Sequence, residues 1–281
     1  IVMEKISVIT TMYKGKQYLE TLLSTVEENR KQLQKKYPQM EIEYIIVNDD
    51  PQEKIEAIDN VVIINNEKNC GIHHSRAKGV KCSTGNYIQF LDQDDWLSKD
   101  ALLKQYENIK DNDISLANGY EQKENETPPI YSSLKKQEEA LNKKWYLAIG
   151  CMIISPGQCL IRKESIPQKW LTYYLDYNCS DDYLLWLMMF EENRKIVLND
   201  EFVFYHNNTG NNISADFETC YRSNLLFCKL ARKYQMLSEK TIKKIERMSN
   251  MKLSWKIEHK NKLVLIFKYF DVFWMNFLYK I

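Results

Sequence analysis

The first hundred residues alternate between short apolar runs and segments in which apolar residues recur at helical spacing. The apolar runs are rich in Ile, Val and Tyr, residues that favour strands. They cover Lys5–Thr11, Ile42–Val47, Val61–Asn65 and Tyr87–Leu91. Segments 18–30 and 70–81 have the spacing of amphipathic helices. This alternation predicts βαβ units, and therefore an α/β fold with a mostly parallel central sheet flanked by helices.

Polar side chains follow three of the expected strands at the point where each strand ends. The pairs are Thr11 with Tyr13, Asn48 with Asp49, and Asp92 with Asp94. In open parallel sheets, ligands bind at the carboxyl ends of the strands, which lie along one edge. Because three separate strands end in this way, we expect their polar side chains to form one binding site.

The segment Asn69–Trp96 carries the strongest chemical signal, because its strand ends in three carboxylates, at Asp92, Asp94 and Asp95. Like charges held together cost free energy unless a cation or hydrogen bonds compensate them. One interpretation is an Asp-rich turn before a helix capped by Ser98. The other is a site for a divalent cation, Mn²⁺ or Mg²⁺, which prefers carboxylate oxygens and would stabilise the diphosphate leaving group of a nucleotide-sugar.

A second acidic pair, Asp181 and Asp182, stands between Ser180 and the apolar run 183–190. Ser is typical of helix N-caps, and acids in a first helical turn can simply stabilise the helix. A carboxylate at this place can also act as a general base that takes a proton from an attacking hydroxyl. A negative neighbour would raise its proton affinity, and the helix N-terminus would lower it.

Three further residues have both a functional and a structural interpretation. Tyr13 could stack on a nucleotide base or cap the first helix. Asp49 could bind a uracil N–H or a ribose hydroxyl, or it could stabilise a turn. Arg76 could contact a phosphate, hold Asp92, or remain solvated. The residues alone leave these alternatives open.

Four segments together resemble the inverting family 2 glycosyltransferases of GT-A fold, of the bacterial surface-glycan type. They are ITTMYKGKQYL (9–19), IIVNDDP (45–51), NCGIHHSRAKGV (69–80) and STGNYIQFLDQDDWL (83–97). The last is similar to the family's Thr-Gly-X-Tyr-Ile-X-Phe-Leu-Asp-X-Asp-Asp segment almost residue by residue. The resemblance covers residues 5–210 and implies a GT-A fold. It implies donor binding by Thr11, Tyr13, Asp49, Asn69, Gly71, Arg76, Asp92 and Asp94.

The resemblance also implies roles in catalysis. Asp94 would hold the metal ion, with Asp92 beside it near the ribose and His206 near the metal or diphosphate. Asp182 would be the catalytic base and Asp181 its acidic partner.

The chain departs from the family pattern after the second strand, where Asn-Asp-Asp-Pro (48–51) replaces the usual Asp-Asp-Gly-Ser. It also lacks the Gln/Arg-X-X-Arg-Trp motif of processive synthases, which favours transfer of one sugar per encounter.

The chain is expected to contain a catalytic domain over residues 1–215, divided into a nucleotide-sugar half (1–118) and an acceptor half (119–215). Residues 216–281 are expected to form a helical extension. Segment 251–281 holds six lysines and two acids, in a sequence rich in Phe, Trp and aliphatic residues. This pattern favours peripheral contact with an anionic membrane. A helix packed on the domain or in a homodimer is the alternative.

Composition limits the classes of binding partner and the cellular compartment that we expect for this protein. A net charge of +1 gives no electrostatic case for nucleic acid. Seven cysteines without paired spacing indicate reduced thiols. The sequence contains no run of about 20 uncharged apolar residues and no signal-peptide pattern. We therefore expect a cytoplasmic protein, peripheral on the inner face of the membrane.

Together with the resemblance, these observations predict a metal-dependent inverting transferase that moves one sugar from a UDP-linked donor to a glycan or lipid-linked acceptor. A non-catalytic nucleotide-sugar or glycan-binding scaffold of the same fold is the alternative. A nicotinamide dinucleotide enzyme is disfavoured because no G-x-G-x-x-G follows the first strand.

Overall fold

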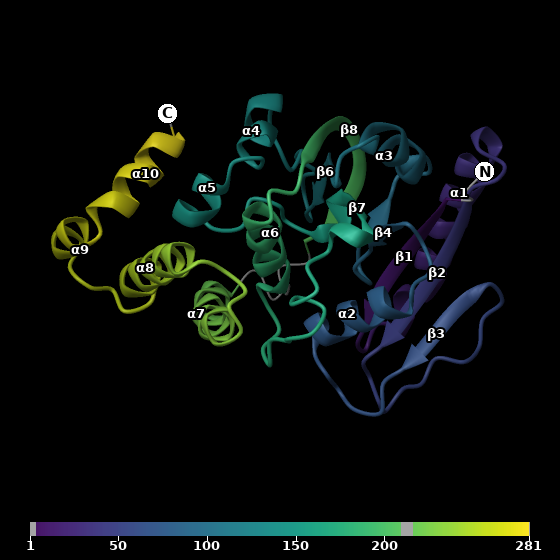
Figure 1. Ribbon diagram of the computed structural model, residues 1–281, viewed down its shortest axis with the longest axis horizontal. Coiled ribbons are helices and arrows are strands. Elements are labelled where there is room, and N and C mark those ends of the chain that lie inside the picture. Colours follow the sequence, from purple (N-terminus) through teal and green to yellow (C-terminus); the bar gives the residue numbers. More distant parts are fainter. Residues whose placement is uncertain (1–3, 209–215, 281) are drawn as a thin grey trace.

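The computed structural model describes residues 4–208 and 216–280. In this part of the chain, eight strands form one sheet in the order β3-β2-β1-β4-β7-β6-β8-β5 (Figure 1). The strands are β1 (Lys5–Met12), β2 (Glu41–Asn48), β3 (Val61–Asn65), β4 (Tyr87–Phe90), β5 (Trp96–Leu97), β6 (Ile114–Gln122), β7 (Cys159–Arg162) and β8 (Ile196–Asn207). The α-helices are α1 (Leu19–Lys36), α2 (Ile72–Cys82), α3 (Ala101–Ile109), α4 (Leu134–Glu139), α5 (Lys143–Ala148), α6 (Asp181–Glu191), α7 (Phe217–Lys233), α8 (Glu239–Lys256), α9 (Lys262–Lys268) and α10 (Phe270–Lys280).

The sheet is mostly parallel, as predicted. Strands β3, β2, β1 and β4 pair in parallel, and so do β6 and β8. Strand β7 joins the two groups by antiparallel pairing with β4 and β6, and the short β5 is antiparallel to β8. The first four strands match the predicted runs to within one residue at each end.

Both faces of the sheet are covered by helices, because alternate side chains of the strands enter two different cores. Ile6 and Val8 of β1 belong to the core beneath α1 and α3. Ile9 belongs to the core that contains Ala77 and Val80 of α2. With both faces buried, the ends of the strands are where a polar site can be open to solvent.

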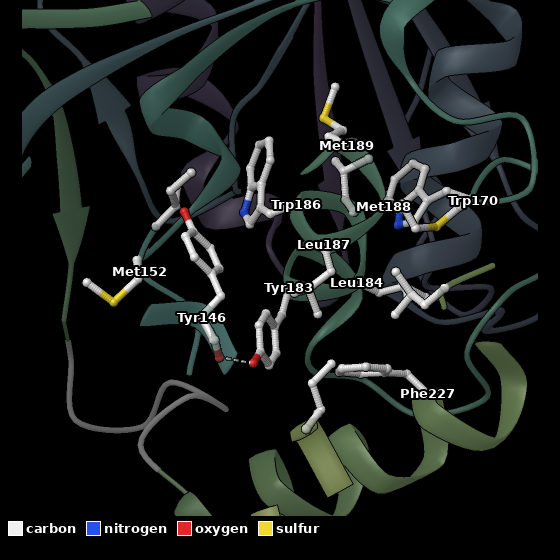
Figure 2. Close-up of a cluster of buried hydrophobic side chains, with 14 of the residues drawn as sticks. Tyr146, Met152, Trp170, Tyr183, Leu184, Trp186, Leu187, Met188, Met189 and Phe227 are labelled. Atoms are coloured by element: carbon white, nitrogen blue, oxygen red, sulfur yellow. Dashed lines mark hydrogen bonds between the residues drawn. The ribbon is translucent and has the colours of Figure 1, made fainter. Parts of the chain in front are cut away.

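Helix α6 lies inside the larger core and positions the second acidic pair. Every residue from 183 to 189 is buried. Figure 2 shows Tyr146 of α5 and Phe227 of α7 packed around the helix, with the Tyr183 hydroxyl donating a hydrogen bond to the Tyr146 carbonyl oxygen. The indole Nε1 of Trp170 donates to the carbonyl oxygen of Asp181 at 2.9 Å. These contacts fix the first turn of α6, which carries both acidic side chains.

The chain from Phe217 to Lys280 is helical, which confirms the predicted C-terminal extension. Helix α7 contributes Phe227 to the main core, and α8 contributes Ile245 and Met248. Between them, the Ser238 hydroxyl accepts a hydrogen bond from the Thr241 amide and caps the start of α8. Helices α9 and α10 lie at the end of the molecule opposite β3 (Figure 1).

Ser180 occupies the N-cap position of α6, as predicted, although it has φ of 66° and makes no side-chain capping bond. Two other predictions about helices are wrong. Asp100, not Ser98, occupies the N-cap position of α3, and the Ser98 hydroxyl donates to the Asp100 carboxylate. The first helix extends to Lys36, six residues beyond its expected end at Arg30.

The polar composition of segment 205–214 predicts a loop, and this prediction is wrong for its first residues. Strand β8 continues to Asn207, because its parallel pairing with β6 reaches Gln122. His206 is therefore held in a strand. The remainder of the expected loop, 209–214, lies outside the described residues.

Candidate active site

The predicted site residues gather around one pocket at the carboxyl ends of β1, β2 and β4. The pocket has a volume of about 380 Å³. It is closed on the other side by the start of α6 and the end of β8. Its walls include Thr11, Tyr13, Asp49, Asn69, Asp92, Asp94, Asp181, Asp182 and His206. Gly71 lines the adjoining groove, and Arg76 lies behind the wall.

Arg76 joins the two halves of the pocket. Its Nη2 lies 2.5 Å from Asp92 Oδ1, and its Nη1 lies 2.9 Å from Asp181 Oδ2. The side chain is buried. Burial alone would lower the pKa of Arg76, but Asp181 and Asp92 raise it, so the guanidinium stays charged. Of the alternatives open from the sequence, the structure shows that Arg76 holds Asp92, and contact with a phosphate remains a prediction.

The first acidic cluster divides into held and open carboxylates. Asp92 accepts from Arg76 and also from the Ser155 hydroxyl, at 3.2 Å. Asp94 is half-buried, and within the described residues no other residue donates a hydrogen bond to it. Burial and the neighbouring charge of Asp92 raise the pKa of Asp94. A carboxylate whose pKa is raised in this way is stabilised by a cation that enters the pocket.

Asp95 is buried behind the wall, where it orients His206. Its Oδ1 lies 3.0 Å from His206 Nδ1 and accepts from the Asn207 amide at 2.9 Å. Burial would lower the pKa of His206, but the hydrogen bond to Asp95 and the acidic cluster raise it. Because Nδ1 is engaged by Asp95, Nε2 is the ring nitrogen left for a ligand.

The protein alone does not assemble a closed metal site here. In residues 4–208 and 216–280, no group of three His, Cys, Asp or Glu side chains could hold an ion. Asp94 and His206 nevertheless line the same pocket and have ligand atoms to offer. Mg²⁺ and similar ions are commonly bound by one or two carboxylates together with substrate phosphates and water. The residues therefore fit an ion that binds together with a diphosphate.

The second acidic pair has one held member and one open member. Asp181 is buried and committed to Arg76. Asp182 lines the pocket, and its Oδ1 accepts from the amide of Tyr183 at 2.7 Å. Burial, followed by the charge of Asp181, raises the pKa of Asp182 to about 7, although Arg76 partly opposes this. A carboxyl group with a pKa near neutrality is well suited to exchange protons with a substrate.

Asp49 organises the turn before α2. Its Oδ1 accepts from the Cys70 amide and from the Asn66 side chain, and its Oδ2 accepts from the Gly71 amide, each at 2.8 Å. Asn69 Oδ1 also accepts from the Gly71 amide, at 3.0 Å. Gly71 has φ of 85°, a conformation that favours glycine. The turn interpretation of Asp49 is therefore correct, and contact with a base remains a prediction.

Tyr13 projects from the end of β1, with 44% of its surface exposed. An exposed ring at the rim of a pocket can stack on a planar ligand without any rearrangement of the core. The amide of Tyr13 donates to the side chain of Gln93 at 2.9 Å, which ties the ends of β1 and β4 together.

The sequence interpretation missed three residues that shape the pocket, Gln93, Ser155 and Asn178. Gln93 bonds Tyr13, Ser155 bonds Asp92, and Asn178 Oδ1 accepts from the Ile72 amide at the start of α2, at 3.0 Å. Only Ser155 had a local signal, because Ser-Pro-Gly-Gln forms a capping box. The other two are placed by tertiary contacts.

Comparison with known proteins decides the family. Residues 7–168 match the model of glycosyl transferase family 2. This chain is a family 2 glycosyltransferase. The match covers the first seven strands of this glycosyltransferase, and the second acidic pair lies beyond it.

Similar proteins agree with the family and the fold. The chain is 34% identical over 110 residues to TuaG of Bacillus subtilis, a glycosyltransferase named for teichuronic acid biosynthesis, covering 36% of this chain and 40% of TuaG. It is 33% identical over 119 residues to glucosyl-dolichyl phosphate glucuronosyltransferase of Haloferax volcanii, covering 38% of this chain and 36% of that protein. The chain thus spans less than half the length of these relatives.

A solved structure extends the likeness to most of the chain. The crystal structure of S. aureus TarS 1–349 with UDP-GlcNAc superposes with a TM-score of 0.62, covering 90% of this chain and 76% of TarS at 17% identity. At this identity the likeness concerns the fold alone. The predicted GT-A architecture is confirmed.

Proposed function

We propose that this family 2 glycosyltransferase is a metal-dependent, inverting and non-processive enzyme. It would move one sugar from a UDP-linked nucleotide-sugar to a glycan or lipid-linked acceptor. The observation that carries the proposal is the Arg76 bridge. Arg76 pairs with Asp92 and Asp181 at once, and so it holds the segment after β4 and the start of α6 at the same pocket. Asp94 and Asp182, which belong to these two segments, line that pocket.

The residues of the pocket suit the two halves of such a reaction. Tyr13 would stack on the base, and the turn held by Asp49 would border the nucleotide. Asp182 would accept the proton of the acceptor hydroxyl while that oxygen attacks the anomeric carbon from the face opposite the leaving diphosphate. Arg76, which contacts both Asp92 and Asp181, would keep these groups in register without touching substrate.

Asp94 and His206 would hold Mn²⁺ or Mg²⁺, with Asp92 beside them. When bound, the ion would neutralise charge that develops on the leaving diphosphate. Asp95 would keep Nε2 of His206 aimed at the ion. This assignment rests on the open carboxylate of Asp94 and on the oriented imidazole, both in the wall of one pocket.

The relatives support the substrate classes. TarS is described with UDP-GlcNAc, TuaG is named for teichuronic acid biosynthesis, and the archaeal relative is named for a dolichyl phosphate-linked sugar. The first of these names supports a UDP-sugar donor, the second an acceptor in surface-polysaccharide synthesis and the third a lipid-linked acceptor. Such an acceptor would suit an enzyme placed in the cytoplasm against the inner face of a membrane.

A panel of nucleotide-sugars tests the proposal. Donors that bind the native state should raise the melting temperature in the presence of Mn²⁺ or Mg²⁺ and less after chelation. Release of nucleoside diphosphate should follow with the same donor, and NMR of the product should show an inverted anomeric centre. Donor-dependent stabilisation without any turnover, unchanged by Asp182→Asn, would favour the non-catalytic scaffold instead.

A further inference from the structure

The two C-terminal helices expose an unusually apolar surface. Leu263, Val264 and Phe267 of α9 are 68%, 61% and 87% exposed. On α10, the exposed side chains are Phe270 (61%), Trp274 (50%), Phe277 (53%) and Leu278 (41%). We call these seven residues the apolar tail face. Exposed apolar patches of this kind on a folded protein mark interaction sites.

The apolar tail face belongs to packed helices. The opposite sides of α9 and α10 are anchored by Leu265, Tyr269 and Val272, which are buried in the main core cluster. Positions 270, 274, 277 and 278 repeat at helical spacing, and the ring of Trp274 stacks on those of Phe270 and Phe277 at 6.3 and 5.6 Å between centroids. The chain breaks at Tyr269, so the tail consists of two helices and not of one continuous amphipathic helix.

The segment that carries this face has an excess of positive charge. Segment 251–281 contains six lysines and two acids. Both acids are already paired, Glu258 with Lys260 at 2.6 Å and Asp271 with Arg247 at 2.8 Å. Burial, followed by the charges of Lys256 and Lys280, lowers the pKa of Lys252 to about 8, as expected where ammonium groups crowd together.

The positive charge of this segment favours an anionic membrane over a second copy of the chain as the partner of the apolar tail face. A second copy of this chain would bring an equally basic surface against the first, because a two-fold interface places the same patch on both sides. An anionic bilayer instead offers hydrocarbon for Phe and Trp and phosphates for the lysines. In the described residues, no helix is long and apolar enough to cross that bilayer, so the contact would be peripheral.

We infer that the apolar tail face lies in the interface of an anionic membrane and carries the enzyme there. The contact would also orient the pocket. Asn276 of α10 donates to the Ala148 carbonyl oxygen of α5 at 2.9 Å, and the ring of Tyr279 packs edge-on against Trp145. From α5, the chain leads within seven residues to Ser155, which bonds Asp92 in the pocket. The docked helices are thus tied to one wall of the active site.

Vesicle flotation tests the inference without any donor or acceptor, so it can fail or succeed independently of the proposed reaction. The full chain should float with phosphatidylglycerol-containing vesicles at about 0.1 M salt and much less with pure phosphatidylcholine vesicles or at high salt. The double variant Phe267→Glu/Trp274→Glu should bind at least about tenfold more weakly, because two apolar side chains are lost and two negative charges are added.

Val62→Glu is the matched control, since Val62 is 44% exposed on β3, at the opposite end of the molecule. It should bind like the parent. Equal melting temperatures would show that the variants are folded. Equal binding by parent and double variant, or no binding of the parent to anionic vesicles, would overturn the inference. A concentration-dependent dimer that the double variant abolishes, with no vesicle binding, would assign the face to a second copy instead.

Discussion

Replacing Asp182 by Asn should stop turnover and stabilise the fold at the same time. Asn keeps the size of the side chain but cannot accept the proton of the acceptor hydroxyl. General-base catalysis typically contributes about 10²–10⁴ in rate, so kcat should fall by that factor. The stabilisation follows because the native protein must otherwise hold a second negative charge beside Asp181.

The size of this effect comes from the pKa of Asp182, which burial and Asp181 raise to about 7. A carboxyl group that binds its proton more tightly in the folded state supports folding fully at acidic pH. That support is lost as pH rises from the unfolded pKa of about 4 towards 7. Each pKa unit corresponds to about 1.4 kcal/mol, so the ionised form costs about 2–4 kcal/mol once the partial exposure of the side chain is allowed for. In a chain of this size that is roughly 4–8 °C in melting temperature.

Two measurements check the prediction. Thermal unfolding should give similar melting temperatures for parent and variant at about pH 4 and a more stable variant at about pH 8. In the parent, kcat/KM measured by nucleoside diphosphate release should fall about tenfold per pH unit below 7, as Asp182 becomes protonated. Asp200→Asn, an exposed carboxyl on β8, is the control and should change neither quantity. A flat pH profile, or a difference in melting temperature that does not depend on pH, would refute the assignment of Asp182.

Four further substitutions probe the rest of the pocket. Tyr13→Ala should weaken UDP binding by about 1–3 kcal/mol in calorimetry, through lost base stacking, with no change in melting temperature. Asp94→Asn should remove the increase in UDP affinity that Mn²⁺ gives to the parent, while binding without metal persists. Arg76→Gln should lower the free energy of unfolding by about 3–5 kcal/mol in denaturant unfolding, because it leaves buried carboxylates unpaired. It should also move the acidic limb of the activity profile to higher pH, since Arg76 lowers the pKa of Asp182. Gly71→Ala should cost about 1–2 kcal/mol in the same unfolding assay, because φ of 85° is strained for alanine.

Much of the fold could be predicted because its signals are local. Strands β1 to β4 are short apolar runs, and the residues just after them are polar, so both the parallel sheet and the edge that carries the site follow from periodicity. The catalytic role of the second acidic pair was predicted from the resemblance to the family, because periodicity alone indicates only helix capping. Its place at the pocket depends on the packing of α6 in the core.

The tail illustrates what periodicity does not decide. Apolar residues surround most of both helices, so the sequence indicates an amphipathic segment without saying which apolar side is buried. Packing selects Leu265, Tyr269 and Val272 for the core and leaves Phe267 and Trp274 outside. Only the structure shows which apolar side chains of the tail lie in the core and which are exposed.

The same limit explains why acidic motifs alone do not define the chemistry. Five carboxylates line the pocket, at Asp49, Asp92, Asp94, Asp181 and Asp182. Three of them make contacts within the protein. Asp49 holds the turn before α2, and Asp92 and Asp181 pair with Arg76. The two that remain open stand on different elements, one at the end of β4 and one on α6. In the proposed mechanism Asp94 would serve the donor and Asp182 the acceptor, and this division of the carboxylates would keep the two roles apart. Arg76 holds two of the three engaged carboxylates and is itself buried behind the pocket, so in that mechanism a positioning residue would decide which aspartates can react.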